Sequence, residues 1–228
     1  MSRKSQRQKD VENRSTGGLL FSLFLAACCA VLGFMLGVAH LALIPTQTVR
    51  RLPAADERNP RMVYYVQPPG GTSATYDVRV NELSAGPAGT IRVSLADMNS
   101  WSAATFSFVP PTEDESNIAI IPSAPRFNIV DGMLNVSTLL EVKAYGKSYK
   151  LLLQTQGTFI QTGTGVEFVP TETCLGSARL PSHVVAPMVN DFIFQVFTSS
   201  EVMTPLVQGW EQLSDVSIEG DTLKLVKS

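Results

Sequence analysis

The sequence predicts an α+β protein: a single N-terminal transmembrane helix, then a long, curled antiparallel β-meander packed on one long apolar helix and a second, shorter helix. Three observations predict this class: an apolar stretch at 18–44, long alternating segments joined by glycine turns within 126–169, and a broad apolar stripe at 184–197. The chain then divides into a disordered basic tail 1–17, the transmembrane helix 18–44, a linker 45–61 and an extracytoplasmic α+β domain 62–228.

The stretch 18–44 contains no Asp, Glu, Lys or Arg. A helix needs about 20 apolar residues to cross a bilayer, and a lone span in lipid has to be helical because its backbone groups find partners nowhere else. A secretory signal is one alternative, although its apolar core is usually shorter, about 7–15 residues. A second alternative is a lipid anchor, because Leu25-Ala26-Ala27-Cys28 resembles a lipobox with Cys28 as the acylated residue. Mostly apolar residues continue after Cys28 where a lipoprotein would have a polar tether, so the uncleaved span is favoured and lipidation stays open.

The charges are unevenly distributed. Residues 1–16 carry five Lys and Arg against two acids, the linker 45–61 carries four Arg against two acids, and residues 62–228 carry nine basic and sixteen acidic groups. Basic flanks tend to stay in the cytoplasm, which favours a cytoplasmic N-terminus and a periplasmic domain on an inner or plasma membrane. An acidic domain repels phosphate backbones, so we expect no nucleic-acid partner.

Within the span, Gly33 and Gly37 form a Gly-x-x-x-Gly pattern. Small residues at this spacing allow two membrane helices to approach closely, so the pair is a candidate contact for a homodimer. The simpler interpretation is that glycine is common in membrane helices.

The first part of the domain predicts short elements. Prolines and charges in 45–61 indicate a semi-extended linker that holds the domain away from the bilayer. Residues 62–67 and 90–94 are expected to be strands, and 75–83 a half-buried strand because its apolar residues alternate with polar ones. Residues 95–104 are expected to be a helix, with Ser94 and Asp97 placed as a capping box.

The centre of the chain predicts unusually long strands. Asp131-Gly132 is a strong hairpin signal between 126–130 and 133–136. Strand 133–144 then turns at Tyr145-Gly146 into a second long strand, and long strands twist and coil. Apolar residues of this sheet and of the predicted helix 184–197 are the candidate lining of an apolar groove: Leu140, Val142, Leu151, Leu153, Phe159, Val189, Phe192, Ile193 and Val196. After that helix, Thr204-Pro205 predicts the start of a second helix, and Gly220-Asp221 the turn of a closing hairpin.

Catalytic chemistry has little support in the sequence. Cys174 and His183 are the domain's one thiol and one imidazole, and a structural cysteine beside a helix-start histidine explains them better than a catalytic pair. Motifs for phosphate cradles, serine hydrolases and zinc sites are absent from the sequence. We therefore expect no enzyme, no cofactor and no metal.

From Leu95 onward the order of elements resembles small bacterial envelope proteins with one membrane helix and a tubular lipid-binding (TULIP-like) domain. The resemblance rests on the helix at 94–101, the hairpin 127–136, the segments 157–159, 166–170 and 176–181, two apolar helices and a closing hairpin at Gly220-Asp221. It implies an elongated curled sheet around a long helix and an apolar groove for acyl chains, and it carries no active-site residue.

Two functions of different class follow from these patterns. In the first, the domain is a non-catalytic interaction or assembly module in an envelope complex, and its apolar interior is core. In the second, the curled sheet and the helix 184–197 leave a groove that binds or transfers a lipid or another apolar ligand.

Overall fold

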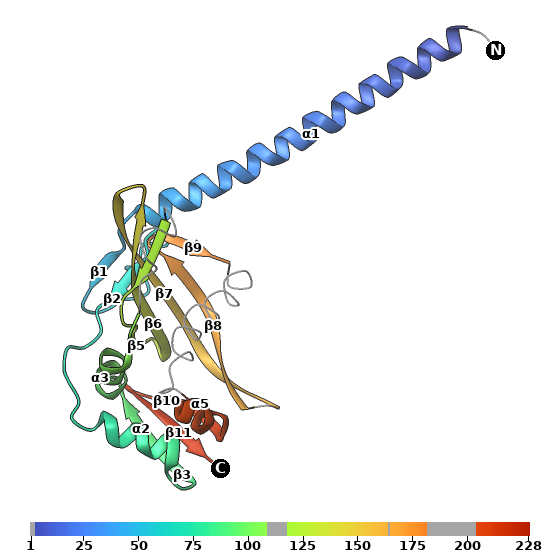
Figure 1. Cartoon of the computed structure of the whole chain (residues 1–228). Helices are drawn as coiled ribbons and strands as arrows, with labels where there is room; N and C mark the ends of the chain where they lie inside the picture. The colour runs from blue at the N-terminus through green and yellow to red at the C-terminus, as the bar shows by residue number, and fades with distance from the viewer. Residues whose placement is uncertain (1–2, 109–117, 164, 182–203) are drawn as a thin grey trace. The chain divides into compact units, whose positions relative to one another are not determined.

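The computed structural model describes residues 3–108, 118–163, 165–181 and 204–228, with side chains from residue 20 onward. It is an α+β protein with an N-terminal apolar helix and a large antiparallel sheet, which confirms the predicted class at that level (Figure 1). The chain forms two compact units, residues 1–41 and residues 42–228. The predicted helix 184–197 and its four candidate residues Val189, Phe192, Ile193 and Val196 lie outside the described residues. The curling of the sheet around that helix therefore stays a prediction.

Helix α1 runs from Arg3 to Leu43. Within it, Leu20–Leu43 is long and apolar enough to cross a membrane, and it is the one such helix in the described chain. Most of the residues predicted as a disordered tail belong to this helix, so that prediction is wrong for Arg3 to Gly17. The physical reason is that a preformed apolar helix removes the nucleation cost, and Gln, Lys and Arg are good helix formers.

The first elements of the domain differ from the predictions. Residues 45–61 contain β1 (Gln47–Val49), which pairs in parallel with β2 (Tyr64–Val66), so the expected linker is part of the fold. The predicted strand at 75–83 is wrong, because Tyr76–Ala85 form helix α2. An apolar residue at 76, 80 and 83 also fits one face of a helix, and Val80 and Leu83 pack beside Leu206.

A three-stranded antiparallel sheet has the order β10-β11-β3, from Leu213–Glu219, Thr222–Lys227 and Gly89–Ser94. Helix α3 (Leu95–Thr105) follows β3 directly, with the predicted Ser94–Asp97 capping box in place. Helix α5 (Thr204–Glu211) precedes β10, as Thr204-Pro205 predicted.

The large sheet has the order β4-β6-β7-β8-β9, and β5 continues the line of β4 along β6. Its strands are β4 (Ile118–Pro122), β5 (Arg126–Val130), β6 (Met133–Ala144), β7 (Lys147–Thr162), β8 (Gly165–Leu175) and β9 (Ala178–Leu180). The hairpins at Asp131-Gly132 and Tyr145-Gly146 lie where the sequence predicted them. Strands β6 and β7, of 12 and 16 residues, are two to three times the usual length of about 5–6.

The main core lies where the three-stranded sheet and α3 meet one end of the large sheet. Leu134 and Val136 from β6 pack there with residues such as Leu223 and Leu225 from β11. The indole nitrogen of Trp210 donates a hydrogen bond to the carbonyl of Val166 at 3.0 Å, which ties α5 to β8. The other end of the large sheet is left free to meet the first residues of the domain.

Candidate binding pocket and membrane attachment

The chain leaves the membrane-length helix directly into the domain. Ala42 is buried, and a Cβ on Gly176 in the β8–β9 turn would overlap the carbonyl of Ala42. The hydroxyl of Ser177 donates to the carbonyl oxygens of Ile44 at 3.1 Å and Pro45 at 3.4 Å. We call residues 42–67, which hold this junction and the β1–β2 pair, the strap.

Side chains from the polar face of the large sheet fix the strap. Gln154 Nε2 donates to the carbonyl of Tyr64 at 3.3 Å, and Asn128 Nδ2 donates to that of Val66 at 3.2 Å. Gln154 and Asn128 are both buried beneath it. Arg58 in the strap also pairs with Asp131 in the β5–β6 turn at 2.9 Å. The strap is therefore held against the polar face of the sheet and is part of the folded domain, where the sequence predicted an open linker.

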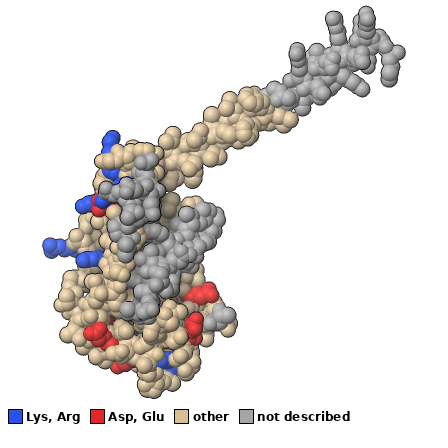
Figure 2. Space-filling model, viewed as in Figure 1, with Lys and Arg blue, Asp and Glu red and all other residues tan. Residues whose placement is uncertain are grey.

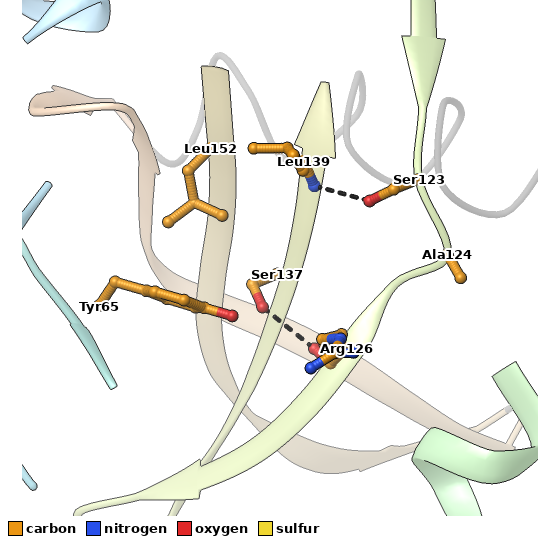
Figure 3. Close-up of a pocket in the computed structure, with 7 residues that line it drawn as sticks. All are labelled: Tyr65, Ser123, Ala124, Arg126, Ser137, Leu139 and Leu152. Atoms are coloured by element: carbon orange, nitrogen blue, oxygen red, sulfur yellow. Dashed lines mark hydrogen bonds between the residues drawn. The ribbon is translucent and has the colours of Figure 1, made fainter. Parts of the chain in front are cut away.

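A partly open pocket of about 440 Å³ lies between the strap and the sheet (Figure 3). This volume falls within the usual range for small-ligand sites, about 300–1,000 Å³. The lining is Tyr65 from β2, Leu139 and Ser137 from β6, Leu152 from β7, Arg126 from β5, and Ser123 and Ala124 from the β4–β5 connection.

The pocket has one charged side chain. Arg126 is exposed, and no ion pair joins it to another of the described residues. The serine oxygens have partners: Ser137 Oγ donates to the carbonyl of Arg126 at 3.3 Å, and Ser123 Oγ accepts from the amide of Leu139 at 3.1 Å. Apolar walls with one guanidinium favour binding of a partly apolar group that carries a negative charge.

A signal for this pocket exists in the sequence, although the sequence reasoning missed it. Leu139 and Leu152 are directly paired across β6 and β7 and lie on the face that otherwise carries polar residues. Neighbours on that face include Glu141 opposite Lys150 and Ser137 opposite Gln154. Two apolar residues that are paired on an otherwise polar face indicate that another part of the chain lies against them. Here that part is Tyr65.

The structure brings together several of the candidate groove residues. Leu140 is paired with Leu151, and Val142 and Leu153 are their neighbours on the same face. Leu140 and Leu153 are buried. Phe159 lies elsewhere, in the core, with ring centroids 5.6 Å from Phe168 and 5.8 Å from Trp210.

Gly33 and Gly37 lie in α1, with no other part of the described chain within 4 Å of a Cβ built on either. Their proposed contact with a second membrane helix stays a prediction.

Cys174 is a buried structural thiol. Burial, together with the nearby charge of Glu172, raises its pKa to about 12, so it is protonated at neutral pH and a poor nucleophile. His183 lies outside the described residues. Across the described ranges, no three His, Cys, Asp or Glu side chains gather in a way that would hold a metal ion.

Asp97 is a buried carboxyl with several hydrogen-bond donors around it. It accepts hydrogen bonds from the amide and hydroxyl of Ser94 at 3.0 and 2.6 Å, from Thr75 Oγ1 at 3.0 Å and from Ser73 Oγ. Burial raises its pKa, but the bonds from Ser73, Ser94 and Thr75 outweigh burial and lower the pKa below its ordinary value. Asp97 therefore fixes the 68–75 loop to α3 and has a structural role.

No protein-family model matches this chain, and a search of curated proteins finds no match either.

Proposed function

We propose that the protein is a single-pass membrane protein whose domain acts as a non-catalytic interaction or assembly module at the membrane surface. The observation that carries this proposal is the pocket of Tyr65, Arg126, Leu139 and Leu152, whose described lining holds no carboxylate, imidazole or thiol. Its partner is an envelope protein that presents a partly apolar, negatively charged segment.

Retention of the span as an anchor is supported by the junction with the domain. A signal sequence cleaved at the end of α1 would remove residues next to a contact that the domain uses, that of Ala42 with Gly176. An apolar helix at Leu20–Leu43 fits either an anchor or a signal sequence by composition. The packing favours the anchor, because cleavage there would leave Gly176 without Ala42 beside it.

The side of the membrane follows from the charges. Five Lys and Arg precede the span within residues 1–16, so the domain is proposed to lie on the extracytoplasmic side, the periplasm of a bacterial envelope. Absence of catalysis is supported by the raised pKa and burial of Cys174. On this proposal the protein acts by binding a partner protein and catalyses no reaction.

A photocrosslinking experiment in cells tests the proposal. A photoreactive amino acid at Leu139, which lines the pocket, should crosslink to one discrete protein, and Arg126→Glu should abolish that crosslink. The matched control places the same group at Ile160, also an exposed apolar strand residue of this sheet but away from the pocket. Equal crosslinking at the two positions, or no effect of Arg126→Glu, contradicts the proposal.

A second candidate is the binding or transfer of a lipid or other apolar ligand, as the TULIP-like resemblance implies. The observation that favours it is the continuous apolar face of Leu140, Val142, Leu151 and Leu153, which the strap does not cover. Native mass spectrometry of the detergent-solubilised chain tests it: a co-purified lipid displaced by Leu151→Trp supports this function.

A further inference from the structure

The hairpin that joins β6 and β7 extends beyond the rest of the large sheet. β8 pairs with β7 from Leu153 to Thr162, whereas β7 begins at Lys147. Residues 147–152 therefore have β6 beside them on one side and no β8 partner on the other. The outer end of this hairpin therefore has β4 beside β6, whereas the other edge of β7 lacks a strand of the described chain there.

An aromatic residue occupies the tip of this hairpin at a conformational cost. Tyr145 and Gly146 form the two-residue turn, with φ of 49° and 76°. Such a turn favours Asn, Asp or Gly, and a bulky residue with positive φ is uncommon. Tyr145 is 79% exposed, so it adds little to the core in return. Strain of this kind at an exposed residue points to recognition.

Three lysines surround Tyr145. Lys143, Lys147 and Lys150 are all exposed on the outer part of the hairpin. Glu141, the acid within the hairpin, accepts a hydrogen bond from Ser148 at 2.8 Å. Figure 2 shows Lys and Arg gathered mainly at the end of the domain that holds this hairpin and the strap, and Asp and Glu mainly at the opposite end. The exposed tip is therefore basic and aromatic.

The hairpin also lies near the residues that emerge from the span. The amide of Gly176, which contacts Ala42, donates to the carbonyl of Leu152 at 2.7 Å. Five residues along β7 separate Leu152 from Lys147, a distance of about 17 Å at 3.4 Å per residue. Thr162 at the other end of β7 is ten residues from Leu152, about 34 Å. The basic tip is thus the end of β7 closer to Ala42, the residue at which the domain begins.

We propose that the β6–β7 hairpin docks on the anionic lipid headgroups of the bilayer that α1 crosses, with Tyr145 at the interface. Tyrosine is enriched at the membrane interface, and lysines near a surface of anionic lipid are attracted to it. The inference rests on the proposed anchoring, and it adds a second attachment that fixes which way the pocket faces.

Fluorescence quenching by brominated lipids tests this contact in the full chain in lipid nanodiscs. Tyr145→Trp reports the tip, and Gln161→Trp, an exposed residue near the other end of the same strand, is the matched control. Trp101 and Trp210 give the same background in both variants. We expect quenching of Tyr145→Trp well above that of Gln161→Trp, and stronger quenching in anionic than in zwitterionic lipid.

The charge contribution is measured in the same chain. The substitutions are made only at lysines of the hairpin. The acidic residues 113–115 are left unchanged, because they lie outside the described residues. Each of Lys143→Gln, Lys147→Gln and Lys150→Gln should reduce the ratio of docked to undocked domain about fivefold. Equal quenching at the two tryptophan positions, or in the two lipids, overturns the inference.

Alkaline extraction of membranes separates the two proposals. A chain that is extracted contradicts the anchoring itself and the inference with it. A chain that stays in the membrane while Tyr145→Trp is unquenched contradicts the hairpin contact alone.

Discussion

Gly176 lies against the backbone carbonyl of Ala42 so closely that no side chain fits between them. Its φ of 55° is also a conformation that other residues rarely adopt. A contact between two backbones that are more than 130 positions apart in the sequence joins the last turn of α1 to the β8–β9 turn.

Replacing Gly176 should weaken the whole domain. Gly176→Ala introduces both an unfavourable φ and an overlap with Ala42, and we expect it to lower the free energy of unfolding by about 1–3 kcal/mol. Gly70→Ala is the control, because a Cβ there meets nothing within 4 Å. Thermal unfolding in detergent, followed by tryptophan fluorescence, measures the difference. Equal stability of the two variants would show that the junction is not packed.

Asp97 should make the stability depend on acid. Asp97→Ala removes the capping box and the bonds to Ser73 and Thr75, for a loss of about 2 kcal/mol at neutral pH. Because folding lowers the pKa, the carboxylate's contribution is complete above its ordinary value of 3.8 and is lost as pH falls through the lowered pKa. The free energies of unfolding of the unchanged chain and of Asp97→Ala, measured from unfolding curves at a series of pH values, should therefore converge in strong acid. A difference in the free energy of unfolding that stays the same in strong acid contradicts this account.

Lys227 should be essential at the end of α2. Its ammonium donates to the carbonyl oxygens of Leu83 and Gly86, both at 2.9 Å, and the residue is buried. Lys227→Met leaves these acceptors without that donor, and we expect a loss of about 1–3 kcal/mol. On the same strand, Lys224 pairs with Glu219 at 3.2 Å near the surface, so Lys224→Met should cost less than about 1 kcal/mol. Similar costs for both variants would contradict a special role for Lys227.

Cys174 should resist thiol reagents in the folded protein. Burial and a pKa of about 12 leave little thiolate near neutral pH. In a Cys28→Ser, Cys29→Ser background, labelling by a water-soluble reagent should be slow until denaturant is added and then become complete. Rapid labelling of the folded chain would reopen the assignment of Cys174 as structural.

Period and turn chemistry made much of the fold predictable. Asp131-Gly132 and Tyr145-Gly146 fixed two hairpins, and strands of more than ten residues left no helical alternative. The segment 76–85 was misread because three apolar residues in eight fit period 2 and period 3.6 almost equally well. A tertiary contact favours the helix, namely the packing of Val80 and Leu83 beside Leu206.

Local sequence patterns do not predict the strap. β1 is three residues long, and its pairing with β2 spans the strap's prolines and charges, which alone predict an open linker. Its stabilisation comes from Gln154 and Asn128, polar residues that looked solvent-facing in the alternation of their strands. A hydrogen bond between a strand's polar face and a distant backbone leaves no periodic trace in the sequence.

The strap also decides where this protein can be divided. A cut at Met62, where the alternating strands begin, would discard β1 and Ala42 and leave one edge of β2 and Gly176 uncovered. A cut before Ala42 keeps them. Ala42 thus belongs both to the apolar helix α1 and to the buried interior of the domain. Exchanging this apolar helix for another would therefore alter the packing of the folded domain as well.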